Sequence, residues 1–112
     1  MKKNIDIYTV ALANAWNTLD VAHLKDLLAE DFHYSSFWVL SEIKSANEYI
    51  EYLSGKFASI KRTGSCVSAT VIPGERYIKL AQDNCRECGI ILCIGEDGKI
   101  SRADMMPIEM CI

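Results

Sequence analysis

Three side chains of this sequence could take part in acid-base chemistry. His33 and Tyr34 are neighbours, and Asp104 lies near the C-terminal end. A histidine titrates near neutral pH, and the pKa of a buried carboxyl or phenol can shift far enough for the group to accept or donate a proton. We therefore take Tyr34, Asp104 and His33 as the candidate catalytic residues.

The chain contains five cysteines, and Cys85 and Cys88 are three positions apart. A structural zinc site usually takes its four ligands from two such pairs, and the other cysteines and histidines form no second pair. A redox motif would place the first cysteine at the start of a helix, whereas residues 89–94 are apolar and predict a buried strand. We expect a structural role for Cys85 and Cys88, with no metal, no cofactor and no disulfide framework.

Composition narrows the class of protein. A chain of 112 residues, half of them hydrophobic, predicts a single domain over residues 1–112. The net charge is -3, and the twelve lysines and arginines are scattered, which argues against nucleic acid as a partner. The longest apolar run, residues 89–94, is too short to cross a membrane, and no secretory leader precedes the first helix. These patterns favour a cytoplasmic protein with no membrane association.

The elements that position these side chains begin with helices. One face of a first helix is apolar at helical spacing, and it includes Leu12 and Trp16. Asp20 can cap a second helix, whose inward face would hold Leu24, Leu27 and Leu28. Ser45 and Glu48 form a capping box at the start of a third helix, whose apolar stripe is Ile50, Leu53, Phe57 and Ile60.

The first expected strand lies between the second and third helices, and the other strands follow the third helix. Residues 32–38 have a period of two, so Tyr34, Ser36 and Trp38 share one face and His33, Ser35 and Phe37 share the other. Later strands are expected at residues 66–72, 76–81, 89–94 and 99–106, with a tight turn at Asp97-Gly98. The order predicts an α+β domain in which an antiparallel sheet curls over three helices and leaves a cavity.

The order of elements, with LDVAHLKDLLAEDFHY at the first joint and EDGKISRADM at the last hairpin, resembles the nuclear transport factor 2-like superfamily. The resemblance covers nearly the whole chain. It implies a cone-shaped, curved antiparallel sheet wrapped around three helices from the N-terminal half, a cystatin-like α+β roll. The superfamily includes ketosteroid isomerases, SnoaL-like polyketide cyclases, scytalone dehydratase and limonene epoxide hydrolase, together with members of no known activity, so fold does not settle function.

The isomerases of this superfamily imply a tyrosine on the first helix, an aspartate base on the first strand and a protonated acid on a later strand. Alignment of the joint and the last turn places Leu12, Ser36 and Ile90 at these positions. Leucine and isoleucine cannot donate a proton to an oxyanion, and an unassisted serine is a poor base at neutral pH. The comparison therefore disfavours steroid isomerisation.

The same alignment predicts the lining of the cavity as a mostly apolar surface with a few hydroxyl groups. Such a lining suits a small apolar or aromatic molecule, although aromatic residues at these spacings can equally be plain core. The expected ligand-binding residues are Leu12, Trp16, Tyr34, Ser36, Trp38, Phe57 and Met105.

The alternative is a SnoaL-like isomerase, cyclase or hydrolase that uses Asp104 or Tyr34 as acid or base. If Met105 faces the cavity, Asp104 faces away together with Arg102, unless a bulge in the last strand reverses this arrangement.

On the outer side of the preceding strand, Ile91 and Cys93 would leave apolar area in water. We therefore predict a homodimer through the outer face of the sheet.

Overall fold

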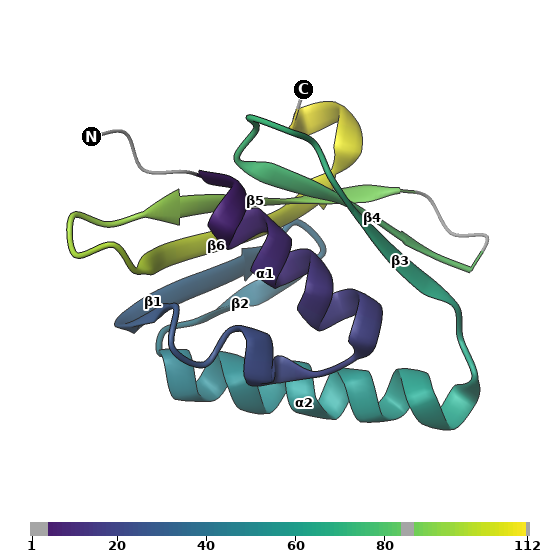
Figure 1. Cartoon of the computed structure of the whole chain (residues 1–112). Coiled ribbons are helices and arrows are strands. Elements are labelled where there is room, and N and C mark those ends of the chain that lie inside the picture. Colours follow the sequence, from purple (N-terminus) through teal and green to yellow (C-terminus); the bar gives the residue numbers. More distant parts are fainter. Residues whose placement is uncertain (1–4, 84–86, 112) are drawn as a thin grey trace.

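The computed structural model describes residues 5–83 and 87–111, and Cys85 lies outside this range. In the described part, two α-helices pack against a six-stranded sheet whose strand order is β2-β1-β6-β5-β4-β3 (Figure 1). The elements are α1 (Ile5–Thr18), η1 (Val21–His23), β1 (Leu28–Ser36), β2 (Val39–Ile43), α2 (Ala46–Thr63), β3 (Val67–Val71), β4 (Tyr77–Gln82), β5 (Cys88–Ile94), β6 (Ile100–Pro107) and η2 (Ile108–Met110).

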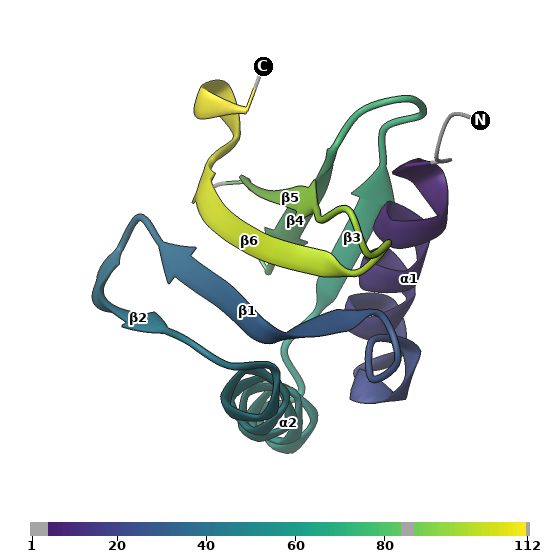
Figure 2. The same cartoon turned by 90° about the vertical axis from the view of Figure 1, so that its left-hand side faces the viewer.

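The inner face of the sheet and the apolar faces of both helices form one core. Buried strand residues such as Ile78, Ile90 and Leu92 belong to the same cluster as Leu12 and Leu53 of the helices. Figure 2 shows the curvature of the sheet, with α1 against β3 and α2 below β1. The sheet does not close, because β2 and β3 are both edge strands, so the predicted cone is an open, curved layer.

The second helix is much shorter than predicted. The Asp20 side chain does accept a hydrogen bond from the Ala22 amide at 2.9 Å, but it caps only the short 3-10 turn η1. The Ile100 amide donates to the Leu27 carbonyl at 2.7 Å, and Leu28 already pairs with Ile100 in the sheet. Pairing with β6 therefore ends the helical segment, and the described residues contain two α-helices where three were expected.

The sheet is mixed rather than antiparallel. β1 and β6 run parallel, and each other pair of neighbouring strands is antiparallel. Parallel strands need a long crossover connection, and here α2 and four strands separate the two partners in sequence. β2, for which the sequence analysis predicted no element, pairs with β1 in a hairpin that extends one end of the sheet.

The local signals at the third expected helix and at the last hairpin are confirmed. Ser45 Oγ accepts a hydrogen bond from the Glu48 amide at 3.1 Å, and α2 ends at Gly64 with a positive φ of 71°. Gly98 has a φ of 78° in the turn before β6, where the Lys99 amide donates to Asp97 Oδ1 at 3.0 Å. These residues position the helix and the strand that flank the candidate site.

Candidate functional site

A cavity of about 180 Å³ lies between the β1-β2 hairpin and α2. Its surface is mostly apolar, and its polar groups are the hydroxyls of two serines and two tyrosines. None of its lining residues carries a charge at neutral pH. The lining residues are Tyr34, Ser36, Val39, Ser41, Ile43 and Tyr52.

The register of the hairpin and the spacing on α2 bring these side chains together. Tyr34 pairs with Ile43 and Ser36 with Val39, and a bulge lies between the two pairs. Residues opposite each other in antiparallel strands project to the same face, so all four turn towards the helix. Tyr52 reaches the cavity from α2, one turn beyond the buried Tyr49.

Three tyrosine rings pack beside the cavity. The ring centroids of Tyr34 and Tyr49 are 4.9 Å apart, and those of Tyr34 and Tyr52 are 5.6 Å apart. Tyr49 and Tyr52 stack at 6.4 Å, and Phe32 lies against Tyr49 at 4.6 Å. These distances lie in the favourable range for aromatic pairs, so the rings form a firm wall for the cavity.

Burial raises the pKa of two phenols of this wall, Tyr34 and Tyr49. Burial is the main cause that raises the pKa of Tyr34 far above its ordinary value, and the nearby Tyr49 and Tyr52 phenols raise it further. Burial, followed by the Tyr52 phenol, raises the pKa of Tyr49 in the same direction. At neutral pH both groups are therefore proton donors in hydrogen bonds and cannot serve as bases.

The two buried phenols differ in their hydrogen-bond partners. Tyr34 Oη lies 3.8 Å from the thioether sulfur of Met105, which is a weak acceptor. The Tyr34 hydroxyl also forms hydrogen bonds with the hydroxyls of Tyr52 and Ser36. The Tyr49 hydroxyl is buried and has no hydrogen-bond partner in the part of the chain that the structure describes. Of these two phenols, the one without a described partner is that of Tyr49, which does not line the cavity.

The expected ligand-binding residues separate into three groups. Tyr34 and Ser36 line the cavity, and Met105 contacts the Tyr34 hydroxyl behind it. Trp38 does not line it: the chain turns after Ser36, so Trp38 lies in the hairpin turn with 55% of its surface exposed. The strand alternation was expected to continue to Trp38, but β1 ends at Ser36, so the placement of Trp38 on the face of Ser36 is wrong.

Leu12, Trp16 and Phe57 are buried core residues and do not line this cavity. The rings of Trp16 and Phe57 meet edge to face at 5.0 Å, which is a packing contact. The alternative that these residues are plain core therefore describes them better than a ligand cage does.

Asp104 and His33 lie on the opposite, outer face of the sheet. Asp104 pairs with Ser35 of β1 and Ile91 of β5, whereas the adjacent Ala103 pairs with the buried Tyr34 and Leu92. The register shift between β5 and β6 precedes Arg102, so alternation from that point onward is regular. Asp104 therefore faces away from the cavity together with Arg102, as strand alternation predicted, and no register shift after Arg102 turns it inward as the alternative of a pocket acid would require.

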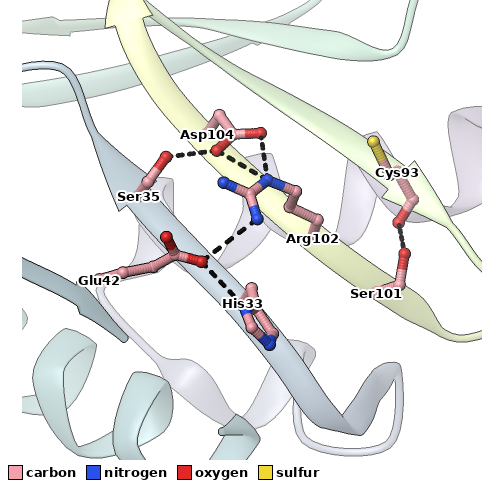
Figure 3. Close-up of polar contacts among 7 residues, drawn as sticks. All are labelled: His33, Ser35, Glu42, Cys93, Ser101, Arg102 and Asp104. Atoms are coloured by element: carbon pink, nitrogen blue, oxygen red, sulfur yellow. Dashed lines mark hydrogen bonds and ion pairs between the residues drawn. The ribbon is translucent and has the colours of Figure 1, made fainter. Parts of the chain in front are cut away.

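A chain of polar contacts joins these outer side chains (Figure 3). Ser35 donates to Asp104, and Arg102 Nε donates to the same carboxylate at 3.0 Å. Arg102 Nη1 donates to Glu42 Oε1 at 3.2 Å, and His33 Nδ1 lies 2.8 Å from that oxygen. The hydrogen bond with His33, followed by the nearby Arg102 charge, lowers the pKa of Glu42.

Four lining residues escaped the sequence analysis, namely Val39, Ser41, Ile43 and Tyr52. Three of them belong to β2, which was not predicted at all. Tyr52 had a usable signal, because Tyr49 and Tyr52 are one turn apart on a helix whose capped start was recognised.

Residues 5–83 and 87–111 contain neither a cluster suited to a metal ion nor a helix suited to a membrane. In that part of the chain, histidine, cysteine, aspartate and glutamate side chains form no group of three that could hold a metal ion. No helix there is both long and apolar enough to span a membrane.

Comparison with known proteins gives matches in structure alone. No family model matches the chain, and no curated protein matches it in sequence. A SnoaL-like protein of unknown function from Burkholderia thailandensis superposes with a TM-score of 0.72 at 14% identity, covering 94% of each chain. A protein of unknown function from Mesorhizobium loti, described as nuclear transport factor 2-like, gives 0.72 at 13% identity, covering 95% of this chain and 94% of its own.

The chain has the nuclear transport factor 2-like fold. A steroid delta-isomerase from Pseudomonas aeruginosa shares it, with a TM-score of 0.60 at 17% identity over 95% of this chain and 80% of its own. In our nuclear transport factor 2-like chain, two positions that the resemblance assigned to isomerase chemistry, Leu12 and Ile90, are buried in the core. The third, Ser36, lines the cavity without a carboxylate or imidazole among the other lining residues.

Proposed function

We propose that this protein binds a small apolar or aromatic molecule in the cavity between the β1-β2 hairpin and α2. The observation that carries the proposal is an uncharged, mostly apolar hollow of about 180 Å³ walled by aromatic rings. An engineered apolar cavity of roughly 150 Å³ is large enough to bind benzene. The natural ligand is accordingly a molecule of about one ring.

The chemistry of the lining supports binding rather than catalysis. Its residues include no carboxylate or imidazole, and Tyr34 is held neutral by burial. General acid-base catalysis works best when the pKa of the catalytic group lies near the working pH, a condition that Tyr34 does not meet. A ligand-binding module therefore accounts for the site with fewer assumptions than an enzyme does.

The binding proposal can be tested by filling the cavity. Ser41 is exposed on β2 and lines the cavity, so Ser41→Leu should occupy the hollow without disturbing the core. Ser68→Leu places the same side chain at an exposed position on β3, at the other edge of the sheet. Titration of small aromatic compounds, followed by NMR, should show binding that Ser41→Leu abolishes and Ser68→Leu retains. Equal binding by both variants would contradict the proposed location.

The second part of the proposal is a homodimer through the outer face of the sheet. Ile91 and Cys93 are only half-buried there, and they pair with Asp104 and Arg102 of the polar chain. Sedimentation should give a dimer mass for the native chain and a monomer mass for Ile91→Glu, whereas Asn14→Glu, at an exposed position of α1, should leave the mass unchanged. A native monomer at micromolar concentration would contradict this part.

A cytoplasmic location stays a prediction.

An enzyme of the isomerase, cyclase or hydrolase kind is the second candidate, since the Tyr34 hydroxyl lines the cavity and can donate a hydrogen bond to a developing oxyanion. Such an enzyme would need a base from the substrate or from water, because the lining offers none. Turnover that Tyr34→Phe abolishes, without loss of binding, would favour it over a binding module.

A further inference from the structure

The two edges of the sheet differ in how they are protected. On the edge strand β3, the Asn17 side chain of α1 donates to the Ala69 carbonyl at 2.9 Å and accepts from the Ala69 amide at 2.8 Å. The opposite edge strand, β2, pairs with β1 alone, and Figure 2 shows it at the rim of the sheet. Proline and charged side chains are common protections of such an edge. β2 contains no proline, and its one charged residue, Glu42, is bonded to Arg102 and His33 on the outer face. The described part of the chain therefore leaves β2 open to pairing with a further strand.

The cavity opens at this same edge. Its inner end is Tyr34 of β1, which is 4% exposed, whereas Val39 of β2 and Tyr52 of α2 are 55% and 38% exposed. Ser41, in the middle of β2, is also exposed and lines the cavity. Residues opposite each other in antiparallel strands project to the same face of the sheet. A strand added to β2 would therefore direct the side chain opposite Ser41 towards the open side of the cavity.

The surface around this edge is apolar and uncharged. Residues 35–41 contain no charged side chain. Phe37 and Trp38 are 60% and 55% exposed, and their rings meet edge to face at 5.6 Å. Two hydrogen bonds hold the backbone of this hairpin tip: the Phe37 amide donates to the Met105 carbonyl at 2.8 Å, and the Trp38 amide donates to Ser36 Oγ at 3.3 Å. Burial of an unpaired charge against such a surface is unfavourable, so the segment that fits it is uncharged.

A second copy of this chain fits the edge less well. Antiparallel pairing of two β2 strands over their full length, across a two-fold axis, places the two Ser41 residues opposite each other and Val39 opposite Ile43. The side chain beside the cavity would then be a serine, which is too small to fill about 180 Å³. Pairing centred on Glu42 would place two carboxylates opposite each other, which is destabilising. An aromatic side chain at the central position matches the size better, since a cavity of roughly 150 Å³ holds benzene.

We infer that β2 is the docking edge for an extended, uncharged peptide segment of another protein, which pairs with β2 through its main chain and inserts one aromatic side chain into the cavity. In strand addition of this kind, main-chain hydrogen bonds give affinity and side-chain pockets give specificity. The inference rests on the proposed function, because the same cavity takes the ring. It identifies that ring as a peptide side chain and gives the edge strand the role of recognising the main chain.

The experiment compares an acetylated and amidated peptide, Thr-Val-Thr-Phe-Thr-Val-Thr, with toluene, which carries the same ring without a main chain. Each probe is titrated into the native chain while the backbone amide signals of β1, β2 and α2 are followed by NMR. The peptide should shift the signals of β2 and bind more tightly than toluene. A peptide with alanine in place of phenylalanine should have a Kd about ten- to a hundredfold higher, because the buried aromatic contact is lost.

Two N-methylated peptides test the main-chain pairing. The amides of alternate residues in a strand point to the same edge of that strand. One peptide is methylated on the amides of its two valines and the other on the amides of the two threonines that flank phenylalanine, so each is blocked along one edge only. One of the two should bind at least about tenfold more weakly than the parent peptide, and the other should keep its Kd within about threefold.

Variants of the chain locate the peptide on the cavity edge. Ser41→Leu, which fills the cavity from β2, should abolish binding of the phenylalanine peptide. Ser68→Leu is the matched control, because it places the same side chain at an exposed position of β3, and it should bind the peptide as the native chain does.

The outcomes separate the two proposals. If toluene binds but the peptide does not shift the signals of β2, or if both methylated peptides bind equally, the peptide inference is overturned while binding of a small molecule stands. If the peptide does not bind and the β2 signals of the native chain move with protein concentration, a second copy occupies the edge, and the inference is overturned as well. If no probe binds to these elements, both the inference and the proposed function fail.

Discussion

Asn17 and Ala69 exchange two hydrogen bonds that cover the free edge of the sheet. Asn17 Nδ2 donates to the Ala69 carbonyl at 2.9 Å, and the Ala69 amide donates to Asn17 Oδ1 at 2.8 Å. Because β3 is an edge strand, a side chain of α1 here takes the place of a neighbouring strand. Unprotected edges expose backbone groups that can pair with other chains.

Asn17→Ala should therefore lower the free energy of unfolding by about 1–2 kcal/mol, measured by urea denaturation. Asn17→Asp should also destabilise, since a carboxylate would face the Ala69 carbonyl where the amide now donates. Asn14→Ala, at another exposed position of α1, is the control and should be neutral or slightly stabilising. Equal stability of the Asn17 and Asn14 variants would refute a structural role for the contact.

Gly89 permits the C-terminal turn to lie directly on the sheet. A Cβ at this position would clash with Cys111 Sγ and lie 3.3 Å from Ile108 Cδ1. Gly89→Ala should destabilise the protein by about 1–3 kcal/mol in thermal or urea unfolding, as overpacked sites do. Cys111→Ala should restore much of the loss in the double variant.

The control for that substitution is Gly55→Ala on α2, where an added Cβ meets nothing within 4 Å. It should stabilise the helix by roughly 0.5–1 kcal/mol, because glycine is a poor helix former. The two alanine substitutions should thus change the free energy of unfolding in opposite directions. A change in the same direction would count against the packing of η2 on Gly89.

Stability should fall in alkaline solution because of the buried phenols. The pKa of Tyr49 is raised by burial above its ordinary value of about 10, so the unfolded chain releases this proton at lower pH than the folded chain. The stabilisation is complete below about pH 10 and is lost as the pH rises further towards the folded pKa. Tyr49→Phe should flatten the decline in unfolding free energy above pH 10. An unchanged slope in this variant would show that other groups cause the decline.

The pKa of Glu42 should depend more on His33 than on Arg102. The hydrogen bond with His33 is the main cause that lowers the pKa of Glu42, and the Arg102 charge contributes less. In a side-chain NMR titration, His33→Ala should move the pKa of Glu42 back towards its ordinary value, and Arg102→Gln should move it by less. The reverse order would indicate that the His33 contact does not persist in solution.

Short-range signals in the sequence predicted the parts of the fold that depend on neighbouring residues. Ser45 and Glu48 marked the start of α2, and Gly98 marked the last turn, because capping and turn geometry are decided within a few residues. The alternation in β1 separated Tyr34 and Ser36 from His33 on the other face for the same reason. The site residues on this strand were accessible to sequence reasoning.

The parts that depend on distant residues were not predictable in this way. The segment around Leu27 has a helical pattern, yet hydrogen bonding to Ile100 draws it into the sheet. The parallel pairing of β1 with β6 and the existence of β2 likewise depend on partners elsewhere in the sheet. Trp38 was misplaced because nothing in its own spacing revealed that the chain turns there.

The position of β2 at the edge of the sheet affects how a ligand would enter and leave. This strand forms one wall of the cavity and is hydrogen-bonded to β1 alone. Outward movement of the hairpin tip, which carries the exposed Phe37 and Trp38, would therefore widen the cavity while the core between α1 and β3–β6 stayed intact. Residence time would then depend on the opening rate of a single hairpin, and global stability and ligand exchange could vary independently of each other.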